Sequence, residues 1–198
     1  YPPMFASAKE AGMTQEQFEQ YVDLHRAAMA EAKTAAGGAV LAGDLLAYRG
    51  ELPQALAVLG AHAEDPRALA LLARVLLRLD RSEEARERLD RGLQAHPAAG
   101  ELWLARGDVA VLEGDAAGAR DAFTRALEGD TGAEGWYGLG LVSSEREYVR
   151  EARRELDESL RRDPGLQKAA AERAVVETLS GNLAEANRRY AALLAEAP

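Results

Sequence analysis

The chain has 198 residues, of which 47% are hydrophobic, and this is enough for one large or two small folded domains. It has no cysteine, which excludes disulfides and thiolate chemistry, and its formal charge of -9 argues against a nucleic-acid partner, because phosphate binding needs clustered Lys and Arg. No run approaches the roughly 20 apolar residues of a membrane span, and the excess of Arg over Lys is typical of a GC-rich gene, so we expect a soluble bacterial protein, cytoplasmic or periplasmic, without membrane insertion.

Residues 1-35 are expected to form an N-terminal extension with one amphipathic helix. Thr14 and Gln17 have the spacing of a capping box, which marks the start of a helix. One helix face is then predicted from residues that recur at intervals of three and four: Phe18, Val22, His25, Met29 and Ala32. We expect this helix to cap the repeats that follow. The alternatives are that it lies in their groove or belongs to a neighbouring domain.

From residue 36 onward the sequence repeats itself with a period of about 34 residues. Trp103 and Trp136 each open the same pattern of small and apolar residues, and they are expected to pack between helices. Self-similarity at such a period indicates a stacked array of structural units. The array is expected to span 36-198 in five units, at about 36-66, 66-99, 100-132, 133-166 and 167-198.

Three columns of residues run through these units. The first is a column of small residues, expected where two helices of one unit approach closely: Gly43, Ala73, Gly107, Gly140 and Ala174. The second lies twelve residues later: Ala55, Ala85, Ala119, Ala152 and Ala186. The third is large, expected between neighbouring units: Leu59, Leu89, Phe123, Leu156 and Tyr190. Because Gly50, Gly114 and Gly181 stand between the small columns, each unit is predicted to be helix, turn, helix.

The pattern resembles the tetratricopeptide repeat (TPR) family. The best match consists of Trp136, Tyr137, Gly138, Leu139 and Gly140, followed by Ala152, Leu156, Asp163 and Pro164. The family's tyrosine near the end of the first helix is absent here. The resemblance implies an all-α fold, a right-handed superhelical solenoid of antiparallel helix pairs with about five repeats plus the N-terminal helix. It also implies a protein-protein interaction module, an adaptor or scaffold.

In such a superhelix the first helix of each unit lines the concave side. We therefore expect a peptide or helix of a partner protein to bind at Arg67, Arg74, Arg78, Leu104, Asp108, Tyr137 and Leu141. Segment 67-99 is rich in Arg and segment 100-132 is acidic, which would orient the ligand. A carboxylate clamp is not expected, since only Arg74 and Lys168 keep a suitable charge at its positions.

Catalysis has little support in the sequence. His25, His62 and His96 lie on separate segments without the spacing of a zinc site, and there is no glycine-rich phosphate loop. We expect no enzyme activity, no cofactor and no catalytic or metal-binding residue. Two alternatives remain open. One is a structural subunit or fragment of a larger bacterial secretion, envelope or polysaccharide-export assembly, with self-association through an open C-terminal end. The other is a regulatory domain of an enzyme.

Overall fold

The computed structural model describes residues 36-128, 131-145 and 148-196, and these form ten α-helices and no strand. The expected all-α helical solenoid is confirmed, whereas the helix expected within residues 1-35 lies outside the described residues. In chain order the helices are α3 (Ala36–Tyr48), α4 (Leu52–Gly60), α5 (Pro66–Arg78), α6 (Ser82–Ala95), α7 (Gly100–Leu112), α8 (Ala116–Ala126), α9 (Gly132–Glu145), α10 (Val149–Arg162), α11 (Gln167–Leu179) and α12 (Leu183–Glu196).

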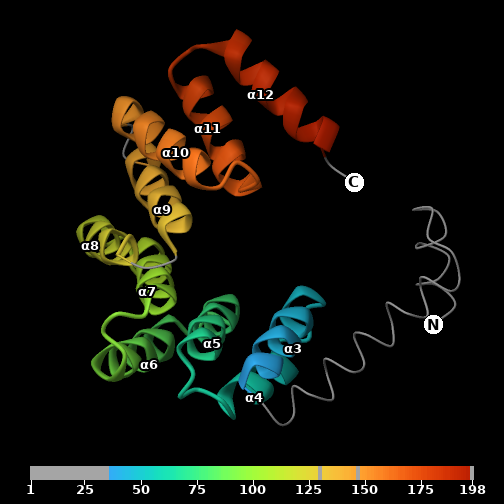
Figure 1. Ribbon diagram of the computed structural model, residues 1–198, viewed down its shortest axis with the longest axis vertical. Coiled ribbons are helices and arrows are strands. Elements are labelled where there is room, and N and C mark those ends of the chain that lie inside the picture. The colour runs from blue at the N-terminus through green and yellow to red at the C-terminus, as the bar shows by residue number, and fades with distance from the viewer. Residues whose placement is uncertain (1–35, 129–130, 146–147, 197–198) are drawn as a thin grey trace, which may run out of the picture.

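The helices pair in sequence, and the pairs follow one another along an open arc (Figure 1). We call α3, α5, α7, α9 and α11 the first helices and α4, α6, α8, α10 and α12 the second helices. Each first helix contacts the first helix of the next pair, whereas the described parts of the second helices do not contact one another. The first helices therefore form the inner layer of the arc, as α5 and α7 show against α6 and α8.

Within a pair, a glycine of the first helix receives a large side chain of the second. A Cβ atom added at Gly43, Gly107 or Gly140 would overlap the side chain of Leu59, Phe123 or Leu156 respectively. The alanine column is equally tight, because Ala55, Ala85, Ala119 and Ala152 are 0% exposed. The close approach expected from the two small columns is therefore present.

Phe123 shows that the large column also fills the space between pairs. A Cβ atom at Gly138, on the first helix of the next pair, would overlap the same ring that Gly107 accommodates. Leu127, one turn later, lies in the same way against Gly135. Neighbouring pairs are thus held together by a large apolar side chain seated on glycine.

Arginines on the second helices add polar contacts between pairs. Arg120 donates to Ser143 Oγ at 2.9 Å and to the buried Glu155 at 2.8 Å, both in the next pair. Arg153, at the equivalent place one unit later, donates to the buried Glu177 at 3.0 Å. Each buried carboxylate therefore has a guanidinium partner, which offsets part of the cost of burying it.

The expected left-handed turn residues are confirmed. Gly50, Gly114 and Gly181 have φ angles of +78°, +73° and +75°, and each ends a first helix. The equivalent place after α5 holds Asp80, with φ of 57°. The following backbone N–H of Arg81 bonds to Leu76 O as that of Asp115 bonds to Ala110 O, so Asp80 adopts the glycine conformation with a side chain attached.

The substitution Ala119→Leu is expected to destabilise the chain by roughly 1–3 kcal/mol, because the added atoms have no room between the helices. Urea unfolding followed by circular dichroism measures the change. Ala117→Leu, on the exposed side of the same helix, is the matched control and should leave the stability nearly unchanged. Equal losses in the two variants would contradict the close contact at Ala119.

Asp80→Gly is expected to stabilise the fold by up to about 1 kcal/mol, because glycine adopts positive φ without a steric penalty. The reciprocal variant Gly114→Asp should lower the stability by a similar amount. Both changes are measured as shifts of the urea midpoint at constant slope. A loss of stability in Asp80→Gly would show that the carboxylate makes a favourable contribution to this turn.

Candidate functional site

Two positions recur on every first helix, the helices that form the inner layer of the arc. The first position is the residue directly after the small column. The second position lies four residues later, on the same face of the helix. All ten side chains at these positions are exposed or half-buried, and together they define what we call the inner surface: Asp44, Tyr48, Arg74, Arg78, Asp108, Leu112, Leu141, Glu145, Val175 and Leu179.

An ion pair joins the second and third units of this surface. Arg74 Nε of α5 lies 3.2 Å from Asp108 Oδ2 of α7, and the two side chains are 42% and 41% exposed. A pair that is open to water contributes little to stability, typically below about 1 kcal/mol. Its polar atoms stay accessible, so this pair is a candidate contact for a ligand.

A cation lies over an aromatic ring between the fourth and fifth units. The Lys168 ammonium of α11 is 4.8 Å from the centre of the Tyr137 ring on α9. Burial lowers the pKa of Lys168, and the charge of Arg74 lowers it further. Burial also raises the pKa of Tyr137, as do the carboxylates of Glu172 and Asp108. Four successive units therefore contribute groups to one electrostatic cluster.

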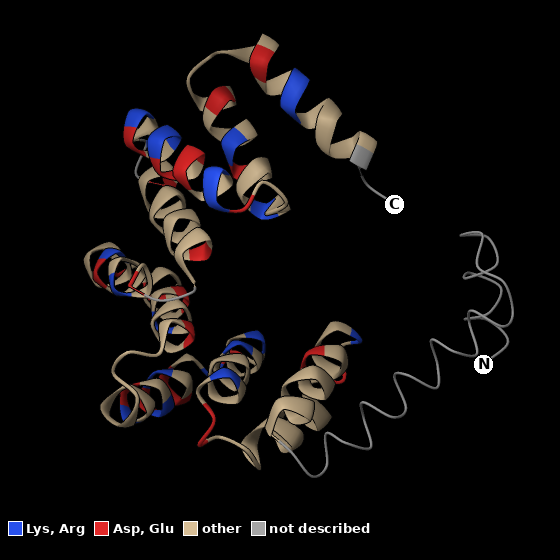
Figure 2. Ribbon diagram, viewed as in Figure 1, with Lys and Arg blue, Asp and Glu red and all other residues tan. Residues whose placement is uncertain are grey.

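The pKa of Asp108 is raised above its ordinary value, first by the partial burial of its carboxyl group, while Arg74 and Lys168 oppose that shift. The cluster around Asp108 therefore combines two cations and one carboxylate within the inner layer. In Figure 2 the basic residues of α5 lie beside the acidic residues of α7. The basic and acidic segments seen in the sequence meet where Arg74 pairs with Asp108.

The structure brings some of the expected site residues together and separates others. Arg74 and Asp108 are paired, and Leu141 is half-buried on the inner surface. Arg67 is exposed at the start of α5, 3.8 Å from Asp65. Arg78 donates to the carbonyl of Ala47 at 2.5 Å, which ties α5 to the end of α3.

Leu104 does not present a surface to a ligand. It is 6% exposed and belongs to the apolar core that contains Phe123 and Leu139. The exposed leucine of α7 is Leu112, which is 65% exposed and was missed in the sequence. A signal for it existed, because Leu112 stands five residues after Gly107 just as Arg78 stands five residues after Ala73.

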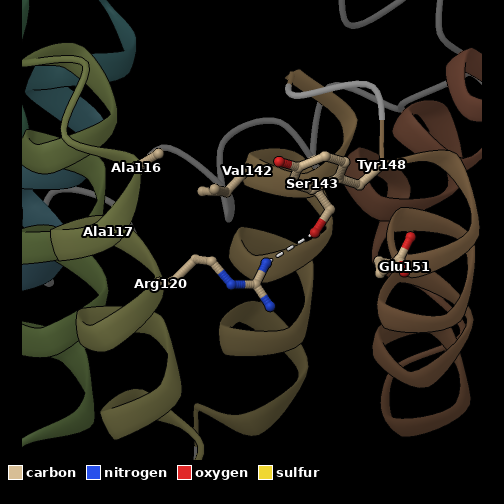
Figure 3. Close-up of a pocket in the computed structure, with 7 residues that line it drawn as sticks. All are labelled: Ala116, Ala117, Arg120, Val142, Ser143, Tyr148 and Glu151. Atoms are coloured by element: carbon tan, nitrogen blue, oxygen red, sulfur yellow. Dashed lines mark hydrogen bonds between the residues drawn. The ribbon is translucent and has the colours of Figure 1, made fainter.

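A separate cavity of about 570 Å³ lies between α8, the C-terminal part of α9 and the start of α10, and it is drawn in Figure 3. Its lining includes Arg120, Ser143, Tyr148 and Glu151. The Arg120 guanidinium is already used by Ser143 and Glu155, so this wall serves the contact between pairs. Within the described residues, no three His, Asp or Glu side chains gather in a way that could hold a metal ion.

Comparisons with known proteins agree with this geometry. Residues 66–109 match the sequence model of the tetratricopeptide repeat family, as the repeat pattern predicted. A search of the curated proteins finds no match to the sequence. No helix in the described part of the chain combines the length and the apolar character required to cross a lipid bilayer.

Several solved structures have the same fold. TTC0263, a TPR protein of Thermus thermophilus, is 22% identical with a TM-score of 0.73, over 83% of this chain and 92% of that chain. PilF of Pseudomonas aeruginosa is 20% identical with a TM-score of 0.68, over 85% and 79%. YrrB, described as a TPR protein with an unusual peptide-binding site, is 22% identical with a TM-score of 0.52, over 86% and 90%. At sequence identities this low, the comparison shows that the fold is shared and nothing further.

Asp108→Asn is expected to change how stability depends on pH. A carboxyl group whose pKa is raised on folding stabilises the folded state when protonated, and this contribution is lost as the pH rises through the folded-state pKa. The wild-type chain should therefore lose stability relative to Asp108→Asn as the pH rises over the acid range that starts at the ordinary pKa of Asp and ends at the raised pKa of Asp108. Urea unfolding of both chains across this range measures the difference, and a constant difference would contradict the raised pKa.

Proposed function

Since this chain carries a tetratricopeptide repeat at residues 66–109 and folds as a TPR array, we propose that it is a protein-interaction module that binds a peptide or helix of a partner protein along the inner surface. It acts as an adaptor or scaffold, without chemistry of its own. The bound segment runs across the first helices and contacts several units at once.

The observation that carries this proposal is the row of exposed apolar side chains at the ends of the first helices. Tyr48, Leu112 and Leu179 are 88%, 65% and 51% exposed at the same register position of three units. Arg78 and Glu145 occupy the same position in the units between them. Exposed apolar side chains that alternate with charged ones at one register position support a surface that a peptide or helix contacts across several units.

The polar groups of the inner surface support a directional contact. Arg74 and Asp108 are paired on this surface, and Lys168 lies over Tyr137 beside it, so these charges have defined partners before a ligand binds. Their half-exposed atoms can accept and donate further hydrogen bonds. The apolar row therefore supplies affinity in this proposal, and the charged cluster supplies orientation.

One similar structure points the same way, because YrrB is described as having a peptide-binding site. The alternatives remain consistent with this surface. A larger bacterial assembly or an associated enzyme would place its own segment on the same first helices. In each case the inner surface is where the partner is held.

The test is Leu112→Ala, measured against peptides selected from a random library on the wild-type chain. Loss of this exposed side chain should weaken the selected peptides about tenfold, which corresponds to about 1.4 kcal/mol. Leu194→Ala is the matched control, because Leu194 is equally apolar and 77% exposed on α12. Equal affinity for wild type and Leu112→Ala would overturn the role of this row.

The double variant Arg74→Asp with Asp108→Arg tests the charged cluster in the same assay. It exchanges the two ends of the ion pair, so the fold keeps an attractive contact while a ligand meets the reversed order of charge. We expect unchanged circular dichroism and altered peptide selection. Identical selection by the two chains would show that the ion pair is not part of the binding surface.

A further inference from the structure

We propose that the segment bound on the inner surface is basic and amphipathic, with Lys or Arg side chains between large apolar ones. This inference rests on the proposed binding function and adds the chemistry of the partner. It concerns the part of the inner surface on α7, α9 and α11, where apolar side chains and carboxylates lie together. Figure 2 shows acidic residues on each of these three helices.

The inner surface of these three helices is mainly apolar. Its six positions on α7, α9 and α11 hold four apolar side chains and two carboxylates, and none of the six is basic: Asp108, Leu112, Leu141, Glu145, Val175 and Leu179. Leu112 and Leu179 are 65% and 51% exposed, and Leu141 is half-buried. Such a face favours a ligand that brings large apolar side chains of its own.

The basic residues of the inner layer already have partners. Arg74 forms an ion pair with Asp108, and Arg78 donates to a backbone carbonyl of α3. Lys168 lies over the Tyr137 ring. An acidic ligand would compete with Asp108 for Arg74 and would meet the same carboxylate as a like charge, which costs binding free energy. These cations therefore do not favour an acidic partner.

Three carboxylates of the same region have no such partner. Glu134 and Glu145 on α9 and Glu172 on α11 are exposed or half-buried, and they form no ion pair within the part of the chain that the structure describes. Burial raises the pKa of Tyr137, and the charges of Glu172 and Glu145 raise it further. Burial lowers the pKa of Lys168, and the charge of Glu134 opposes that shift. The unpaired charge beside the apolar face is therefore negative.

One face of α9 shows how a basic side chain fits. Tyr137, Leu141 and Glu145 follow one another at intervals of four, so they form a stripe along that face. Lys168 lies over the ring at the start of the stripe, and Glu145 stands at its other end. A Lys or Arg of the partner is placed at this second end, where its alkyl part packs on Leu141 and its charge meets the carboxylate.

The test uses the peptides selected from the random library on the wild-type chain. Their sequences should be enriched in Lys and Arg beside Leu, Ile or Phe. The double variant Glu145→Gln with Glu172→Gln keeps the size of both side chains and removes their charge. It should weaken the binding of these peptides about tenfold in fluorescence polarisation, because two attractive contacts are lost.

Glu83→Gln with Glu87→Gln is the matched control. Both carboxylates are exposed on α6, a second helix, and neither forms an ion pair within the described residues. The control removes the same amount of negative charge and should leave the affinity unchanged. Equal losses in the two double variants overturn the inference, because the peptides would then respond only to the total charge of the chain.

The outcomes separate the basic partner from the proposed binding function. Acidic or uncharged peptides that bind more weakly to Leu112→Ala overturn the basic partner and leave the proposed function in place. Basic peptides that lose affinity in Glu145→Gln with Glu172→Gln, but not in Leu112→Ala, support the basic partner and overturn the role of the apolar row. A selection that yields no binding peptide overturns both.

Discussion

The rest of the structure depends on the close approach of two helices at a glycine or alanine. In three units a glycine of the first helix accepts the large side chain of the second, so the two backbones come within a distance that any added Cβ atom would prevent. Phe123 extends this packing to the next unit through Gly138. Because the same contact recurs in successive units, their relative rotation also recurs, and an arc with the first helices inside follows.

The contacts between units change character along the arc. In the N-terminal half, one apolar cluster runs from Leu46 to Val109 without a buried charge. Between the last two units the apolar cluster is small, and Arg173 and Glu177 are buried together with support from Asp157 and Arg153. A buried charged network depends on all of its partners being present, so this junction tolerates the loss of one side chain poorly. The last two junctions thus include a buried carboxylate paired with an arginine, whereas the N-terminal apolar cluster contains no buried charge.

The repeat allowed most of the fold to be predicted, and the candidate surface less completely. Five coincident alanines and the turn glycines identified the helix pairs, because close packing and positive φ restrict which residues fit. Leu104 and Leu112 show where prediction of the surface from the sequence fails. Both lie on α7 and both are apolar, yet Leu104 packs into the core while Leu112 stands in water. The division depends on which neighbours cover each residue, and for Leu104 these include Leu139 of the next unit.

The sequence by itself therefore determined the helix pairs, their order and the packing of one helix on its partner, because these depend on residues less than one repeat apart. Only the tertiary structure decided which groups meet across units. Arg74 meets Asp108 and Lys168 meets Tyr137 because the first helices stack at the inner layer of the arc. Such contacts depend on the rotation from unit to unit, which is a property of the packed array.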